Sequence, residues 1–209
     1  EPMGMLKRDH IKAMLAMPRI RTLWEEKYGR PSGEADIDSL YQMFEGKLMS
    51  ILENFTDIKP GVLETVKVLR EKGIATGSTT GYTDGIMEIV VKKAEEHGYK
   101  PDAWFSPDST NKLGRPYPYM IYRNMEAFAV SSADGVVKVG DTVSDIKEGE
   151  SAGVFSIGII EGSSEMGLSR EEYDSLTGEE KSRRAALVTA KYAEAGADAG
   201  IPRSGEHTA

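Results

Sequence analysis

The sequence contains no cysteine, which excludes disulfide bonds, thiol nucleophiles and zinc–thiolate centres. Its three histidines, His10, His97 and His207, are too scattered to indicate a zinc cluster. No apolar run approaches the roughly 20 residues that a membrane-spanning helix needs. No stretch near the start has the basic, apolar and small-residue order of a signal peptide. These absences favour a cytoplasmic protein that does not enter a membrane.

Positive charge is also scarce, since 26 basic residues stand against 34 acidic ones and the net charge is −8. An acidic protein of this kind is a poor non-specific binder of nucleic acid, so we expect no nucleic-acid partner. The 209 residues are 39% hydrophobic and 29% charged. These values indicate one large globular domain, or one domain with a modest insertion.

Two patterns of secondary structure follow one another along the chain. Residues 5–55 are expected to be helical, with one amphipathic helix broken or kinked at Pro18 and a second over residues 34–54. After Pro60-Gly61, strands expected at 74–78, 102–106, 136–140 and 154–159 alternate with helices at 62–72, 85–97, 119–129, 144–152 and 179–195. This alternation predicts an α/β fold with a parallel sheet covered by helices on both faces.

A hydroxyl-rich loop follows the first expected strand. Residues 78–83 read STTGYT and precede a helix, so their hydroxyls and the free N–H groups of the helix start could hold a phosphate. N-capping of that helix by Thr83 or Asp84 is the alternative interpretation.

Two carboxylates, Asp141 and Asp145, follow the apolar strand at 136–140. The pair suits a hard cation such as Mg²⁺, with one carboxylate as ligand and the other orienting a water or a lysine. In the alternative interpretation, Asp145 only complements a helix N-terminus.

Arg115 lies between Gly114 and Pro116, which makes its backbone rigid, and a bidentate guanidinium suits phosphate or phosphonate oxygens. An ordinary surface arginine in a turn would look the same in the sequence.

Lys7 shares a helix face with Ile11 and Met14, so its amine should be partly desolvated, and desolvation disfavours the charged form. A neutral amine is a nucleophile that can form a Schiff base with a carbonyl compound. His10 lies one turn away and could move protons. A lysine that merely extends its charged end to solvent is the alternative.

Together these segments resemble the phosphonoacetaldehyde hydrolases (phosphonatases), a family of the haloacid dehalogenase superfamily. The matching strings, in chain order, are PMGMLKRDH, GSTTGYT, GRPYPYM, KVGDTVSDIKEG and GSSEMGLSREE. The resemblance extends from about residue 1 to about residue 196. The first two strings are much more specific to phosphonatases than the GDxxxD loop, which occurs across the superfamily.

The resemblance implies a Rossmann-like core over residues 56–200 and a helical cap over residues 1–55 that closes on it. The C-terminal stretch shows no periodicity, so a disordered tail is expected at 201–209. It implies cleavage of the C–P bond of phosphonoacetaldehyde to acetaldehyde and phosphate. It further implies a Mg²⁺ cofactor and a homodimer joined through the caps.

The resemblance also implies roles for individual residues. Lys7 matches the Schiff-base lysine, and Asp141 matches a metal ligand with Asp145 behind it. The remaining matches are residues around the substrate and its phosphoryl group: Met3, Gly4, His10, Thr80, Gly81, Tyr82 and Arg115.

One family feature has no counterpart here. The nucleophilic aspartate of these enzymes stands at the end of the first core strand, in a DxAGT-like string, and no such string occurs in the 209 residues. We therefore expect the first core strand to be missing from this chain and the chain alone to be inactive. Because a central parallel strand satisfies the ladder groups of two neighbours, we also expect poor folding, aggregation or strand exchange of the isolated chain.

Two other functions remain open at this stage. A phosphate-monoester hydrolase on the same scaffold would not need Lys7. A degenerate, non-catalytic fragment would retain only the surfaces of the enzyme.

Overall fold

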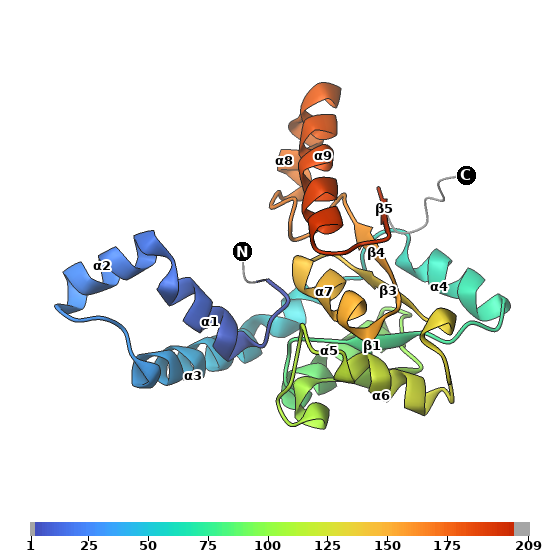
Figure 1. The fold of residues 1–209 in the computed structure, drawn as a ribbon, viewed down its shortest axis with the longest axis horizontal. Helices are drawn as coiled ribbons and strands as arrows, with labels where there is room; N and C mark the ends of the chain where they lie inside the picture. Colours follow the sequence, from blue (N-terminus) through green and yellow to red (C-terminus); the bar gives the residue numbers. More distant parts are fainter. Residues whose placement is uncertain (1–2, 203–209) are drawn as a thin grey trace.

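A computed structural model describes residues 3–202 of the chain. Figure 1 shows three helices standing to one side of an α/β body that contains all the strands. We call these three helices, α1–α3, the helical lobe. Of the expected tail, residues 203–209 lie outside the described residues.

The helical lobe consists of α1 (Lys7–Ala16), α2 (Pro18–Tyr28) and α3 (Glu34–Ile51). The expectation of two helices was wrong, because Pro18 does not merely interrupt the first helix but begins a new one. Proline suits this position, since the first N–H of a helix has no partner to lose. Arg8 joins α1 to α3 through ion pairs of 2.7 Å with Glu34 and Asp38.

A 3₁₀ helix, η1 (Leu52–Phe55), and a short segment without regular secondary structure connect the lobe to the α/β body. The connection contacts α5 (Asp84–Glu96), where His97 Nδ1 lies 3.2 Å from the carbonyl oxygen of Thr56. The next helix, α4 (Val62–Glu71), begins after Pro60-Gly61 as predicted. Gly73 follows it with φ of 74°.

Five short strands form two parallel sheets. The first sheet pairs β1 (Gly77–Thr79) with β2 (Ala103–Phe105), and the second has the order β3 (Val137–Gly140), β4 (Phe155–Ile159), β5 (Ala199–Ile201). The four expected strands are present. The fifth was missed, and the expectation of a tail from residue 201 was wrong there, because Ile201 pairs with Ile159.

The single parallel sheet expected from the sequence is thus divided between β1 and β3. Within the described residues these two strands are not paired with each other. Side chains join them instead, since the Lys138 amine on β3 donates a 2.7 Å hydrogen bond to the Thr79 hydroxyl on β1.

Helices pack on both sheets, but the expectation of helices on both faces was wrong for β3 and β4. Val137, Val139 and Phe155 remain 54%, 51% and 50% exposed on the face opposite α7. α6 (Tyr119–Ala127) packs on β1 and β2, and α7 (Val143–Ala152) packs on β3 and β4. α9 (Gly178–Glu194) packs against α7 and β5, and a short helix, α8 (Arg170–Ser175), precedes it. Two further 3₁₀ turns are η2 (Pro107–Thr110) and η3 (Ala133–Gly135).

The main apolar core lies between α7, α9 and the loop after β4, with members Ile146, Ile160, Met166, Tyr173, Val188, Tyr192 and Ala195. Across residues 3–202, the structure contains no helix with the length and apolar character needed to cross a membrane.

Candidate active site

The site-bearing loops meet where β1 and β3 end and the helical lobe begins. We call residues 3–6, which precede α1, the lobe loop. A side chain on Gly81 would place its Cβ 2.5 Å from the carbonyl oxygen of Met5, and one on Gly4 would lie 2.5 Å from Thr142 Oγ1. Glycine at both positions therefore lets the lobe loop pack directly on the loops after β1 and β3.

Two side chains of the α/β body also hold the lobe loop. Ser144 Oγ donates a 2.8 Å hydrogen bond to the Met3 carbonyl, and Arg115 Nη1 donates a longer one of 3.4 Å to the Gly4 carbonyl. The predicted residue Gly4 thus lies against the predicted residue Arg115, and Met3 lies against the start of α7.

Lys7, the first residue of α1, directs its amine toward the α/β body. Its Nζ atom lies over the ring of Tyr82, 5.1 Å from the ring centroid. Burial lowers the pKa of the Lys7 amine, and the positive charge of Arg115 lowers this pKa further. The desolvation expected from the apolar stripe is therefore present, and it increases the fraction of neutral, nucleophilic amine.

His10 and Tyr82 complete the surroundings of the amine. The Nδ1 atom of His10 is buried without a hydrogen-bond partner among the described residues. Burial lowers the pKa of His10, and the charge of Lys7 lowers it further, so the neutral imidazole is favoured near neutral pH. Burial raises the pKa of Tyr82, which keeps its phenol protonated.

The start of α5 differs from the expected phosphate seat. Asp108 already accepts a 2.8 Å hydrogen bond from the Asp84 N–H, and Thr83 makes no side-chain cap. The Asp108 carboxylate thus binds an N–H group at the start of α5, in place of the capping by Thr83 or Asp84 that the sequence left open. The hydroxyl of Thr80 instead accepts a 3.1 Å hydrogen bond from the Tyr82 N–H, which folds the loop back on itself.

The Arg115 guanidinium is buried and largely bonded to the protein. Nε donates to Glu148 Oε2 at 3.0 Å, and Nη2 donates to the carbonyl and hydroxyl of Thr79 at 2.7 and 2.9 Å. Nη2 also forms a 2.9 Å ion pair with Asp145. Nε and Nη2 are thus engaged by the protein, and Nη1, with its one long bond, retains capacity for a ligand, so the predicted contact of Arg115 with phosphonate oxygens stays a prediction.

The two predicted carboxylates have different partners. Asp145 lies 2.9 Å from both Arg115 and Lys138 and 2.6 Å from Thr142 Oγ1. Burial alone would raise the pKa of Asp145, but the two cations outweigh burial and hold this pKa at about 2. Asp145 thus orients a lysine, one of the two roles that its position allowed.

Asp141 remains available for a ligand. Its Oδ2 atom accepts hydrogen bonds of 3.0 Å from the N–H and the hydroxyl of Ser164, and Oδ1 has no hydrogen bond within residues 3–202. One free carboxylate oxygen at a strand end fits a hard cation such as Mg²⁺. The described part of the chain contains no cluster of three or more acidic or histidine side chains, so it supplies only part of such a site.

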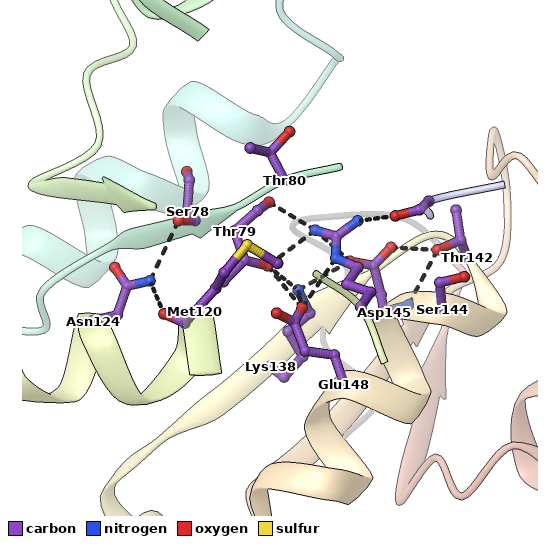
Figure 2. Close-up of polar contacts among 12 residues, drawn as sticks. Ser78, Thr79, Thr80, Met120, Asn124, Lys138, Thr142, Ser144, Asp145 and Glu148 are labelled. Carbon is purple, nitrogen blue, oxygen red and sulfur yellow. Dashed lines mark hydrogen bonds and ion pairs between the residues drawn. The ribbon is translucent and has the colours of Figure 1, made fainter. Parts of the chain in front are cut away.

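Sequence reasoning missed three residues that surround Arg115. Figure 2 shows Thr79, Lys138 and Glu148, which come from β1, β3 and α7, pointing toward one another. The only local signal was Lys138, a charged residue inside the apolar strand VVKVG, since lysine is almost never buried without a partner.

Comparison with known proteins identifies relatives that match most of this chain in sequence. Residues 7–153 match the haloacid dehalogenase-like hydrolase family. A phosphonoacetaldehyde hydrolase of Lysinibacillus sphaericus is 55% identical over 87% of this chain and 67% of its own length. One of Bacillus cereus is 46% identical over 96% of this chain and 76% of its own length.

A solved structure agrees with this match. The crystal structure of a phosphonoacetaldehyde hydrolase-like protein from Oleispira antarctica superposes with a TM-score of 0.92 at 32% sequence identity. The superposition covers 99% of this chain and 74% of that one. The two proteins thus share the α/β body and the helical lobe.

Proposed function

Because the chain belongs to the haloacid dehalogenase-like hydrolases, and within them to the phosphonoacetaldehyde hydrolases, we propose that its residues carry the Schiff-base half of C–P bond cleavage in phosphonoacetaldehyde. The observation on which this rests is the position of Lys7. Its half-buried amine, with a lowered pKa, lies over Tyr82 and within the field of Arg115.

A C–P bond is hard to break because carbon would have to leave as a carbanion. The neutral Lys7 amine attacks the aldehyde carbon, and loss of water gives a protonated imine. This iminium accepts the electron pair of the breaking C–P bond, so carbon leaves as an enamine rather than as a carbanion. The phosphoryl group passes to the aspartate nucleophile of the family as an aspartyl-phosphate, and these 209 residues do not supply that aspartate. Water then adds to the re-protonated imine and releases acetaldehyde, which restores the amine.

The residues around the amine divide the remaining tasks. His10, neutral and one turn from Lys7, moves the protons of imine formation. Arg115 Nη1 and the Thr80–Tyr82 loop bind the phosphonate oxygens. Met3, Gly4 and Gly81 bring the lobe loop close enough for Lys7 to reach the aldehyde carbon of a substrate whose phosphonate is bound in this way.

Asp141 would hold Mg²⁺ through its free oxygen, and Asp145 would act behind it by fixing Arg115 and Lys138. A bound Mg²⁺ would supply positive charge to the transferring phosphoryl group. No residue of this chain matches the nucleophilic aspartate of the family, so we assign no phosphoryl-accepting role within these 209 residues.

We further propose that residues 1–55 belong to a cap over the core at 56–200 and that two copies associate through their caps in the cytoplasm. Exposed apolar side chains on the helical lobe support this association, since Leu23 is 53% and Met43 is 70% exposed.

Borohydride trapping tests the proposed function without requiring turnover. Borohydride reduces a Lys7 imine to a stable secondary amine, which mass spectrometry locates. We expect phosphonoacetaldehyde to label Lys7 and the Lys7→Ala variant to lose this label, whereas Lys12→Ala, an exposed lysine of α1, retains it.

Absence of any adduct on Lys7 would contradict the Schiff-base assignment. It would favour either a phosphate-monoester hydrolase, which needs no such lysine, or a chain that does not bind the aldehyde at all.

A further inference from the structure

Glu148 is a fully buried carboxylate, with no exposed surface, that the proposed chemistry does not use. Its Oε2 atom accepts three hydrogen bonds, from Thr79 Oγ1 at 2.8 Å, Arg115 Nε at 3.0 Å and Lys138 Nζ at 2.8 Å. Its Oε1 atom is buried without a partner among the described residues. All the bonding of this side chain is thus concentrated on one oxygen that faces Arg115.

Thr79 is saturated by the same cluster. Its hydroxyl donates to Glu148 and accepts from Arg115 Nη2 and from Lys138. A hydroxyl has one donor and two acceptor sites, so none remains for a ligand. Thr79 therefore locks neighbouring side chains in place, although it lies beside the proposed phosphonate loop.

The cluster balances two cations, Arg115 and Lys138, against two carboxylates, Asp145 and Glu148. Buried ion pairs of this kind give little net stability, because removal of the charges from water costs about as much as their attraction returns. Conformational specificity is the better explanation for retaining them. These ion pairs fix Arg115, which is the residue proposed to bind the phosphonate.

The two carboxylates hold different edges of the guanidinium. Glu148 accepts a hydrogen bond from Nε, whereas Asp145 and Thr79 both contact Nη2. With both of these nitrogens fixed, the planar group cannot turn, and Nη1 stays directed at the Gly4 side of the site. Lys138 bridges the two carboxylates and completes the charge balance.

We infer that Glu148, with Lys138 as its counter-cation, is a positioning residue that fixes Arg115 for recognition of the phosphonate group. This inference rests on the proposed function, in which Lys7 forms the imine and Arg115 binds the phosphonate. It assigns to Lys138 a structural charge rather than a direct contact with the substrate.

The test compares two aldehydes in the borohydride experiment. Phosphonoacetaldehyde carries the group that Arg115 binds, and acetaldehyde lacks it, so the ratio of their Lys7 trapping rates measures phosphonate recognition alone. We expect Glu148→Leu to lower this ratio about tenfold, since a charge-assisted hydrogen bond that orients the guanidinium is lost. Trapping with acetaldehyde should be unchanged.

Three matched variants complete the set. Glu148→Gln keeps an oxygen that can accept from Nε and should recover much of the ratio. Glu150→Leu removes an exposed carboxylate from the same helix and should leave the ratio at its wild-type value. Arg115→Met should lower the ratio at least as far as Glu148→Leu.

The double variant Lys138→Met/Glu148→Leu separates positioning from stability. Replacing both partners by apolar side chains removes the unpaired buried charge, so the melting temperature should return toward that of the wild type. The trapping ratio should stay low. If Glu148→Leu alone fails to fold, the trapping ratio of this double variant tests the positioning role of Glu148 instead.

The outcomes are distinguishable. A wild-type trapping ratio in folded Glu148→Leu, or recovery of both the ratio and the melting temperature in the double variant, would overturn the inference while leaving the proposed function intact. Failure of the wild type to form any Lys7 adduct would overturn the proposed function and this inference with it.

Discussion

The hydroxyl of Ser144, at the start of α7, donates a 2.8 Å hydrogen bond to the carbonyl oxygen of Met3 in the lobe loop. This bond crosses from the α/β body to the segment that immediately precedes Lys7. It therefore links the loop that carries the predicted acidic pair to the position of the proposed nucleophilic amine.

Replacing Ser144 by alanine should loosen the start of α1. One hydrogen bond contributes about 1 kcal/mol, which corresponds to roughly fivefold faster hydrogen exchange of the amides near Lys7. Mass spectrometry of exchanged peptides measures this change. Ser50→Ala, which removes a hydroxyl that donates to the Lys47 carbonyl within α3, is the control. Equal exchange in Ser144→Ala and the wild type would show that the bond does not restrain the loop.

A methyl group at Gly81 should destabilise the contact between the lobe loop and the loop after β1. Its Cβ would lie 2.5 and 2.8 Å from the carbonyl oxygens of Met5 and Gly4, and backbone atoms cannot move aside cheaply. We expect Gly81→Ala to lower the free energy of unfolding by about 1–3 kcal/mol in urea titrations.

Gly85→Ala is the matched control for Gly81. No atom lies within 4 Å of a Cβ at Gly85, which stands in the first turn of α5. Alanine there should leave the free energy of unfolding unchanged or raise it by up to about 1 kcal/mol. Equal losses at the two glycines would contradict the close approach of the lobe loop.

The pH dependence of imine trapping should report the lowered pKa of Lys7. Only the neutral amine attacks the aldehyde, so the trapping rate should rise with pH and reach half its maximum below the ordinary lysine value of 10.5. Arg115→Met removes one of the two causes and should move the midpoint upward, whereas Arg115→Lys keeps the charge and should not. A wild-type midpoint at or above 10.5 would be incompatible with a desolvated amine.

Stability should fall in acid as Asp145 is protonated. Its pKa is about 2 in the folded protein against an ordinary value of 3.8, so the unfolded chain binds the proton more readily. The contribution, about 2 kcal/mol, is complete above pH 4 and is lost as pH falls from about 4 toward 2. Urea titrations between pH 2.5 and 7 measure this slope.

Asp145→Asn should remove that part of the acid slope and destabilise the protein at neutral pH by about 3–5 kcal/mol, because Arg115 and Lys138 lose a buried counter-charge. The control Glu25→Gln, which replaces an exposed acid on α2, should leave the change of unfolding free energy with pH as it is in the wild type. An unchanged acid profile in Asp145→Asn would refute the assignment.

The proposed association through the helical lobe predicts a dimer by light scattering after size-exclusion chromatography. Met43→Glu places a charge on the 70% exposed apolar position of α3 and should shift the protein toward monomer. Leu187→Glu, at a 62% exposed position of α9 outside the lobe, should not. Dissociation by Leu187→Glu rather than by Met43→Glu would place the interface elsewhere.

Local pattern was sufficient for most elements of the fold. The apolar periodicity between Gly61 and Gly73 predicted α4, and the apolar run before Gly140 predicted β3. Both signals lie within a few adjacent residues. Pattern failed at β5, since the three residues of Ala199–Ile201 show no alternation and become a strand only by pairing with β4. It also misread Pro18, which is compatible with both the end and the beginning of a helix.

The sequence by itself determined which chemical groups are present: an amine heading an apolar helix, a hydroxyl loop after one strand and two carboxylates after another. Only the tertiary structure decided how they are used. It placed Lys7 over Tyr82, left Asp141 with a free oxygen, and enclosed Arg115 among Thr79, Asp145 and Glu148. The physical reason is separation along the chain. Thr79 on β1 and Glu148 on α7 stand 69 residues apart, and no local periodicity records a contact between a strand of one sheet and a helix packed on the other.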